Sequence, residues 1–136
     1  MKQKKFMDIS RIKKDTELTV ANTGGFHVGD HIVIQEKVDG SNSAIAYDKE
    51  TNKLVSFSRR QTLDYNNTLN GFWNWVQTLA VEPFSKYPNY VFFMEWLTKH
   101  TIKYIPEAYG KSYFYDVYDK KNECYLPQSE VKRLAD

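Results

Sequence analysis

The sequence predicts a single α+β domain, residues 1–136, in which helices flank an antiparallel sheet. Short apolar segments are separated by turn signals, and one later segment changes to helical spacing. A chain of 136 residues with 41% apolar and 26% charged residues suits one compact domain. No apolar run approaches the roughly 20 residues of a membrane-spanning helix, and the N-terminus lacks the apolar centre of a secretory signal. We therefore expect a cytoplasmic protein.

The first strands are expected between residues 31 and 59. In His31–Val38, Ile32 and Ile34 alternate with residues of the other face, which predicts a strand. The turn signal "DGSN" follows, and the extended segments "SAIAYD" (43–48) and "LVSFSR" (54–59) are separated by the turn signal "DKETNK". Together these segments predict an antiparallel meander.

The remaining elements include a helix that covers the sheet. From Thr68 the apolar residues recur at helical spacing, and Pro83 ends the pattern. The residues of this apolar face are Leu69, Phe72, Trp73, Val76, Leu79 and Ala80. "NYVFFMEWL" (89–97) and "SYFYDVYD" (112–119) predict two further strands, and "LPQSEVKRLAD" (126–136) predicts a helix that starts near Pro127. The lone Cys124 permits no internal disulfide and is expected to be a packing residue.

Three charged residues interrupt apolar segments: Lys37, Glu95 and Asp116. Burial of an unpaired charge costs several kcal/mol, so such residues either lie at exposed strand ends or gather around a shared ligand. Their joint occurrence favours a shared site.

Lys37 is the candidate nucleophile of that site. A lysine attacks only as the free amine, which burial or a neighbouring cation favours. The small residues Gly40 and Ser41 follow it and leave room for a close approach of the ligand. This arrangement suits covalent catalysis on a phosphate.

The segment "EKVDGSN" (36–42) resembles the K-x-D-G motif of the covalent nucleotidyltransferases, which include the polynucleotide ligases and the mRNA capping enzymes. "FSRR" (57–60), "FFMEWL" (92–97) and "YFYDVYD" (113–119) resemble the next motifs of the family, in the same order. DNA ligases and capping enzymes usually carry arginine two places after the glycine. This sequence has Asn42 at that place and Glu36 before the lysine, a pattern similar to that of the RNA ligases of the T4 RNA ligase 2 type.

The resemblance implies an ATP-dependent RNA ligase with an antiparallel nucleotidyltransferase fold. Lys37 would attack the α-phosphate of ATP to give lysyl-AMP, with Mg²⁺ neutralising the leaving pyrophosphate. The AMP would pass to an RNA 5′-phosphate, and an RNA 3′-hydroxyl would then seal the strand. The implied nucleotide-binding residues are Glu36, Asp39, Gly40, Asn42, Arg59, Glu95, Tyr115 and Asp116.

The resemblance also implies individual roles. Glu36 would contact the adenine, Asn42 the ribose, and Arg59 the ribose or the phosphates. Glu95 would accept hydrogen bonds from the ribose hydroxyls or help to hold the metal, and Tyr115 would stack on the purine. Arg60 is the alternative to Arg59, and Phe114 is the alternative to Tyr115.

The chain departs from the family after Asp116, where neither the later metal-binding glutamate motif nor the K-x-K motif follows. We therefore expect residues 1–136 to be the N-terminal part of an RNA ligase adenylyltransferase domain, or else a naturally shortened version of a ligase, and the activity of this chain alone stays open. One alternative is a noncatalytic nucleotide- or RNA-binding fragment. Another is a DNA ligase or a capping-type enzyme.

Overall fold

The computed structural model describes residues 1–9 and 28–136. These residues fall into two compact units, one made of Met1–Lys5 with Lys37–Asp136 and the other within Phe6–Glu36. All the helices and strands of the described residues belong to the first unit. No helix in the described part of the chain is long and apolar enough to cross a membrane.

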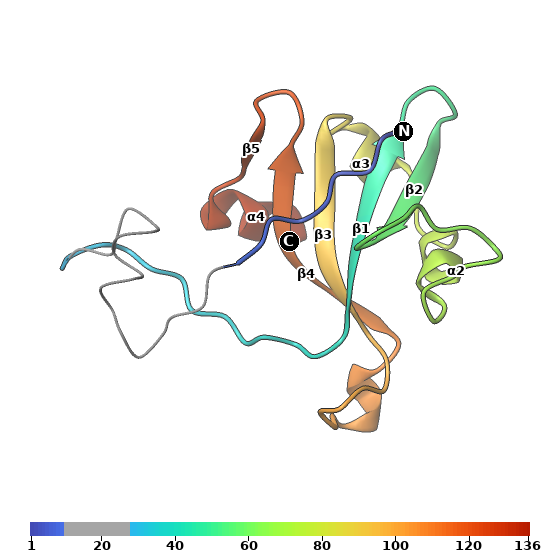
Figure 1. Cartoon of the computed structure of the whole chain (residues 1–136). Coiled ribbons are helices and arrows are strands. Elements are labelled where there is room, and N and C mark those ends of the chain that lie inside the picture. The colour runs from blue at the N-terminus through green and yellow to red at the C-terminus, as the bar shows by residue number, and fades with distance from the viewer. Residues whose placement is uncertain (10–27) are drawn as a thin grey trace. The chain divides into compact units, whose positions relative to one another are not determined.

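The first unit is built on a five-stranded antiparallel sheet with the order β2-β1-β3-β4-β5 (Figure 1). Its strands are β1 Ser41–Asp48, β2 Lys53–Ser58, β3 Tyr90–Leu97, β4 Lys111–Asp119 and β5 Cys124–Tyr125. The sheet confirms the antiparallel α+β class and the four predicted strands that correspond to β1, β2, β3 and β4. The short edge strand β5 was not predicted, and Cys124 within it is exposed rather than packed.

The strand predicted at His31–Val38 is wrong, because residues 28–40 of the structure contain no strand. Ile32 and Ile34 are 61% and 87% exposed. A strand forms by hydrogen bonding to a partner, and β1, the expected partner, pairs along one edge with β2 and along the other with β3. Alternation of apolar residues therefore did not suffice to form a strand here. Of the predicted three-stranded meander, only the hairpin of β1 and β2 is present.

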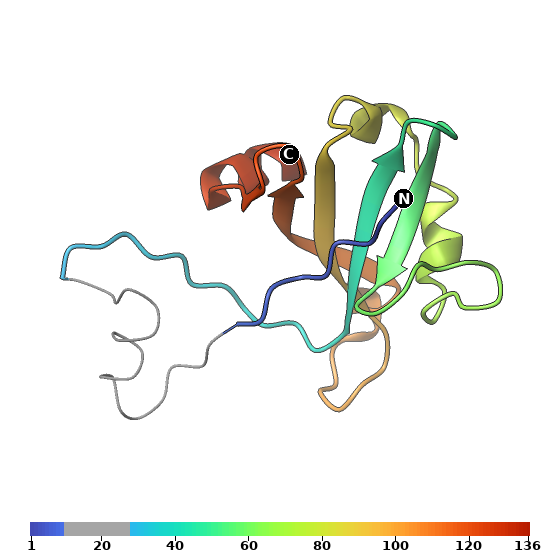
Figure 2. The same cartoon turned by 45° about the horizontal axis from the view of Figure 1, so that its top comes forward.

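Three helices, α2 Phe72–Val76, α3 Glu82–Ser85 and α4 Gln128–Ala135, pack against one face of the sheet (Figure 2). A short 3₁₀ helix, η1 Pro106–Ala108, lies in the connection between β3 and β4. The apolar core joins the helices to alternate strand residues, as the two-residue period of a strand requires. Its main members are Ile45, Phe72, Val76, Phe92, Met94, Trp96, Val117 and Val131. The predicted C-terminal helix is confirmed as α4.

The helix predicted from Thr68 is much shorter than its pattern indicated. Leu69, Asn70 and Gly71 all have positive φ angles of 51°, 52° and 90°, which exclude a right-handed helix before Phe72. Pro83 does not end that helix but lies in the first turn of α3, where the missing N–H costs nothing. Most of the predicted apolar face still packs in or against the core, whereas Ala80 is exposed.

The opposite face of the sheet carries Ala44, Ala46, Val91 and Phe93, all at most 2% exposed. Residues Met1–Lys5 cross the sheet in both views (Figures 1 and 2). The Gln3 side-chain amide donates to the Ser58 carbonyl on β2 at 2.5 Å. The Lys4 ammonium lies 4.2 Å from the centre of the Tyr118 ring on β4, in a cation–π contact. The N-terminal residues thus span the strands from β2 to β4.

Candidate functional site

Polar side chains gather at one end of the sheet, on the face opposite the three helices. Asn42 on β1 pairs in register with Glu95 on β3, and Glu95 pairs with Tyr113 on β4. Paired residues of neighbouring strands point to the same face. Because Met94 and Trp96, the neighbours of Glu95, belong to the helix-covered core, Asn42 and Glu95 point away from the helices.

An irregularity in β4 brings two consecutive residues onto this same face. Met94 pairs with Phe114 whereas Phe93 pairs with Asp116, so Tyr115 is an extra residue in the β4 strand. The Asn42 amide donates to the Tyr115 hydroxyl at 2.6 Å, which places that ring beside Glu95. Phe114 packs against the helix-side core instead. Of the two alternative stacking residues, only Tyr115 therefore lies on the face of the candidate site.

Gly40 connects the turn that contains Lys37 to the start of β1, one of the inner strands of the sheet. The Gly40 N–H donates to the Glu95 carboxylate, Oε1, at 3.2 Å. A Cβ atom at position 40 would lie only 2.5 Å from the backbone oxygen of Trp96. No other residue type fits without a shift of the backbone, so glycine is required here for the close approach to β3.

Asp39 faces a different partner, the connection between β3 and η1. Its backbone N–H donates to the Tyr104 hydroxyl at 2.9 Å, and its carboxylate, Oδ2, accepts from the Ile102 N–H at 2.9 Å. Ser41 Oγ lies 3.4 Å from His100 Nε2 on the same connection. From the sequence, the lysines and tyrosines of this segment were compatible either with a contact to RNA or with an exposed connection, and neither Tyr104 nor His100 was predicted as a site residue. The length of the connection was a further available signal.

The electrostatics of the site favour neutral forms of its acids. Burial raises the pKa of Glu95, and the Gly40 N–H and the charges of Lys37 and His100 act in the opposite direction. Burial also raises the pKa of Asp116, whose Oδ1 accepts from the Val117 N–H at 2.9 Å. The pKa of Tyr115 is raised as well, first by burial and then by the charges of Glu95 and Asp116. The site is thus a partly buried group of acidic and phenolic side chains on one face of the sheet, which suits contact with a positive group or a metal-bound phosphate.

Lys37 lies close enough to Glu95 for its charge to lower the pKa of that carboxyl group. Contrary to expectation, Lys37 is exposed and does not end a strand. Because the strand predicted before it is absent, its position depends on the packed turn at Gly40.

Arg59 follows the last residue of β2. Val55 and Phe57 pair with Ala46 and Ala44, which lie on the face of the candidate site, but β2 ends at Ser58 and the chain bends at residues 59–61, so the side of the sheet on which Arg59 lies stays a prediction. Arg60 has the opposite parity. Glu36 belongs to the unit Phe6–Glu36, which is described separately, so its contact with adenine stays a prediction.

Magnesium can be tested against the donor atoms of the site. In residues 1–9 and 28–136, no three His, Cys, Asp or Glu side chains are grouped so as to hold a metal ion by themselves. Mg²⁺ often keeps several waters and is bound through one or two carboxylates together with substrate phosphates. Glu95 and Asp116 are carboxylates on one face, so the donor set fits an ion that arrives with a nucleotide.

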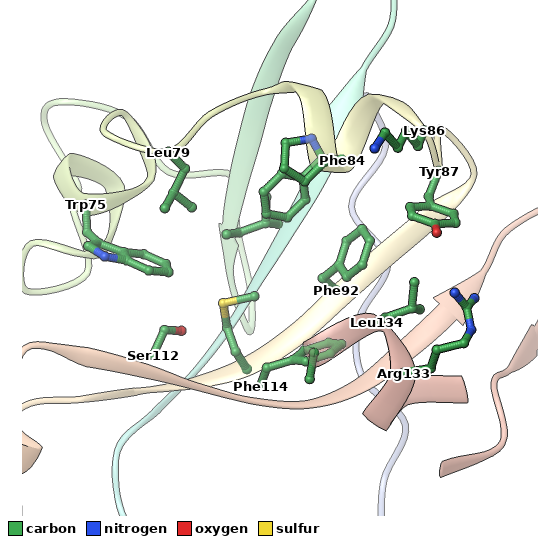
Figure 3. Close-up of a pocket in the computed structure, with 14 residues that line it drawn as sticks. Trp75, Leu79, Phe84, Lys86, Tyr87, Phe92, Ser112, Phe114, Arg133 and Leu134 are labelled. Carbon is green, nitrogen blue, oxygen red and sulfur yellow. The ribbon is translucent and has the colours of Figure 1, made fainter. Parts of the chain in front are cut away.

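A separate pocket lies on the helix-covered side of the sheet (Figure 3). Its volume is about 380 Å³, and its walls come from α2, α3, α4 and the facing strands. The aromatic lining residues include Trp75, Phe84, Tyr87, Phe92 and Phe114. Apart from Phe114, the alternative to Tyr115, none of the predicted site residues lines this pocket, so the candidate site lies on the opposite face of the sheet.

Comparison with known proteins agrees with this fold. A protein-family profile described as RNA ligase matches residues 30–136. Two solved structures of an archaeal ATP-dependent RNA ligase, forms 1 and 2, resemble the chain with TM-scores of 0.57 and 0.56 at 22% and 20% identity. Each match covers 74% of this chain and 27% of the archaeal chain. No curated protein sequence matches the chain significantly.

The antiparallel sheet with its flanking helices therefore has the fold found in RNA ligases. Since the family profile extends over most of the sequence, the chain belongs to the RNA ligase family. It spans about a quarter of the length of the solved ligases that it resembles.

Proposed function

We propose that residues 1–136 are the N-terminal part of the adenylyltransferase domain of an ATP-dependent RNA ligase, with Lys37 as the nucleophile. The observation that carries the proposal is the packed turn at Gly40. It brings the segment that begins with Lys37 against Glu95, beside Asn42 and Tyr115. The archaeal proteins of the same fold are ATP-dependent RNA ligases by name, which supports ATP and RNA as the substrates.

The first step joins the Lys37 Nζ to the α-phosphorus of ATP. The N–P bond forms as the bond from the α-phosphorus to the bridging oxygen breaks, and pyrophosphate leaves with that electron pair. The ammonium must first give up one proton, because it has no lone pair, and the nitrogen loses a second proton to solvent as the phosphoramidate forms and keeps its last N–H. Mg²⁺, when bound, would neutralise negative charge on the phosphates.

The remaining residues bind and orient the nucleotide. Asn42 and Glu95 offer polar side chains to the ribose hydroxyls, and Tyr115 offers a ring face to the purine, a contact worth about 1–3 kcal/mol. Arg59, which directly follows β2, would grip phosphate oxygens in a fork, and Asp116 would lie beside the metal-bound phosphate. Glu36 would contact the adenine.

The later steps follow the chemistry of the phosphoramidate. The AMP passes to the 5′-phosphate of RNA, and Lys37 leaves as the free amine. An RNA 3′-hydroxyl then attacks the 5′-phosphorus, displaces AMP and seals the strand.

Intact-mass measurement tests the proposal. The chain is incubated with ATP and Mg²⁺, and Lys37→Ala serves as the control. A gain of one AMP on the wild type alone supports the covalent chemistry. ATP binding without the adduct would mean that this stretch of chain is a noncatalytic nucleotide-binding module. A gain from GTP instead, or transfer to DNA but not to RNA, would indicate a capping-type enzyme or a DNA ligase.

A further inference from the structure

The connection between β3 and β4, residues 98–110, is a built structure rather than a loose loop. The Gly110 N–H donates to the Leu97 carbonyl at 2.9 Å and closes its base. Within the loop, the Tyr104 N–H donates to the Tyr109 hydroxyl at 2.9 Å, and the Tyr113 hydroxyl of β4 donates to the Ala108 carbonyl at 3.0 Å. Long loops with their own internal bonding are often functional.

Asp39 fastens this loop to the turn that carries the proposed nucleophile. The loop residues Ile102 and Tyr104 both bond to Asp39, one to its carboxylate and one to its N–H. Asp39 is only two residues after Lys37. Figure 1 shows this loop at the same end of the sheet as the start of β1. The loop therefore stands at a fixed place beside Lys37.

The part of the loop nearest the site is positively charged. Lys99, His100 and Lys103 are exposed, and Glu107 is the single acidic residue of positions 98–110. His100 is the one that reaches the site, since its Nε2 lies 3.4 Å from Ser41 Oγ and its charge affects the Glu95 carboxylate. An imidazole at this place can donate a hydrogen bond to a phosphate oxygen.

We propose that residues 98–105 form a phosphate-binding arm, in which His100 contacts a phosphate of the substrate and Asp39 positions the arm. The phosphate belongs either to ATP or to the 5′ end of the RNA. The identity of these substrates rests on the proposed function. The contact between His100 and a phosphate is tested by ligand binding alone, without any covalent step.

Two binding measurements on His100→Ala separate the sources. The first uses an ATP analogue with a methylene group between the α- and β-phosphates, which cannot release pyrophosphate. The second compares a short RNA that carries a 5′-phosphate with the same RNA that carries a 5′-hydroxyl. Lys49→Ala, in the exposed turn at the other end of β1, is the matched control for the loss of a cation.

We expect His100→Ala to raise the Kd of one of these ligands about tenfold, the effect of losing one charge-assisted hydrogen bond. Weaker binding of the analogue assigns the contact to ATP. Loss of the preference for 5′-phosphate RNA assigns it to the RNA end. His100→Gln, which keeps a donor, should recover part of the binding. If neither ligand is affected more than by Lys49→Ala, the arm does not bind phosphate.

Tyr104→Phe tests whether Asp39 positions the arm. It removes the acceptor of the Asp39 N–H without altering Asp39 or His100. We expect it to weaken the same ligand as His100→Ala, and to have no further effect once His100 is already alanine, because its action passes through His100. Fully additive effects of the two changes would contradict a positioning role.

The two proposals can fail separately. If His100 affects phosphate binding but no AMP adduct forms on the wild type, the arm stands and the ligase proposal for this chain fails. If the adduct forms and His100→Ala behaves like Lys49→Ala in both measurements, the ligase proposal stands and the arm is excluded.

Discussion

At position 40 the side chain is excluded by the backbone of a neighbouring strand. A Cβ atom there would lie 2.5 Å from the Trp96 carbonyl oxygen, so Gly40→Ala must push the turn away from β3. We expect the free energy of unfolding to fall by about 1–3 kcal/mol, and the formation of lysyl-AMP to be lost because the turn leaves Glu95. Urea unfolding and intact mass after incubation with ATP measure the two effects.

Gly71→Ala is the control for that experiment. Gly71 has a φ of 90° but open space around its Cβ position, so the substitution strains the backbone at the start of α2, on the helix-covered side of the sheet. We expect a loss of stability of about 1 kcal/mol without loss of the adduct at temperatures where the protein is folded. Equal loss of the adduct in both variants would show that the Gly40 contact is not what places Lys37.

Asp116 makes a pH-dependent contribution to stability. Burial raises the pKa of Asp116 in the folded protein, so the folded state binds its proton more tightly than the unfolded state does. Its stabilising effect is present below the ordinary carboxyl pKa and is lost as the pH rises through the raised value. Asp116→Asn should therefore raise the free energy of unfolding at neutral pH and leave it unchanged in acid.

Urea unfolding at neutral and acidic pH measures this difference, and Asp48→Asn is the control of opposite sign. A side-chain hydrogen bond from Thr51 lowers the pKa of Asp48, so that carboxylate stabilises the fold above its ordinary pKa and the effect is lost as the pH falls. A destabilised Asp116→Asn variant at neutral pH would show that interactions of the ionised carboxylate outweigh the cost of its burial.

At the scale of elements, the strand patterns predicted β1, β2, β3 and β4 because each strand is apolar on at least one face and ends at a turn signal. The patterns also placed Glu95 and Asp116 correctly within buried strands. They could not show that Tyr115 and Asp116 share a face, because strict alternation assigns consecutive residues to opposite faces. That arrangement depends on the irregular register between β3 and β4, which no local pattern reveals.

The absent strand at His31–Val38 and the shortened helix after Thr68 have related causes. The apolar alternation of His31–Val38 resembles that of a strand, but a strand needs a partner strand with a free edge. Both edges of β1 are already paired, one with β2 and one with β3. The helical spacing after Thr68 correctly indicated which residues face the core, but the left-handed backbone at Leu69 and Asn70 limits α2 to five residues. The sequence pattern after Thr68 therefore predicted which side chains are buried, but it did not predict the backbone conformation.

The α4 helix depends on its buried face rather than on its surface charges. Val131 is 4% exposed in the core, whereas the ion pair between Arg133 and Glu130, 2.9 Å apart, is 57% and 48% exposed. Eight residues are too few for a stable isolated helix. We expect Val131→Ala to cost about 1–2 kcal/mol and Arg133→Ala less than about 0.5 kcal/mol in urea unfolding. A larger loss from Arg133→Ala would mean that its contacts at the pocket matter more than the packing of Val131.

At the scale of the whole first unit, the sheet separates two tasks. Its helix-covered face holds the apolar core and the pocket of Figure 3, and its other face holds Asn42, Glu95, Tyr115 and Asp116. Substitutions on the helix side should therefore change stability alone, and substitutions among the site residues on the other face should change nucleotide binding. The strands connect the two, because β1, β3 and β4 contribute residues to both faces.

Ligand-linked stability tests this separation. The methylene ATP analogue at a concentration 100-fold above its Kd should raise the free energy of unfolding of the wild type by about 2.7 kcal/mol. Val131→Ala, on the helix side, lowers the stability of the free protein but should show the same increase on addition of the analogue. Asn42→Ala, which removes the hydrogen bond to the Tyr115 hydroxyl, should show a much smaller increase at that concentration. Urea unfolding with and without the analogue measures all three. If the increase disappears in Val131→Ala and persists in Asn42→Ala, the nucleotide binds in the pocket on the helix side of the sheet rather than at the site on the opposite face.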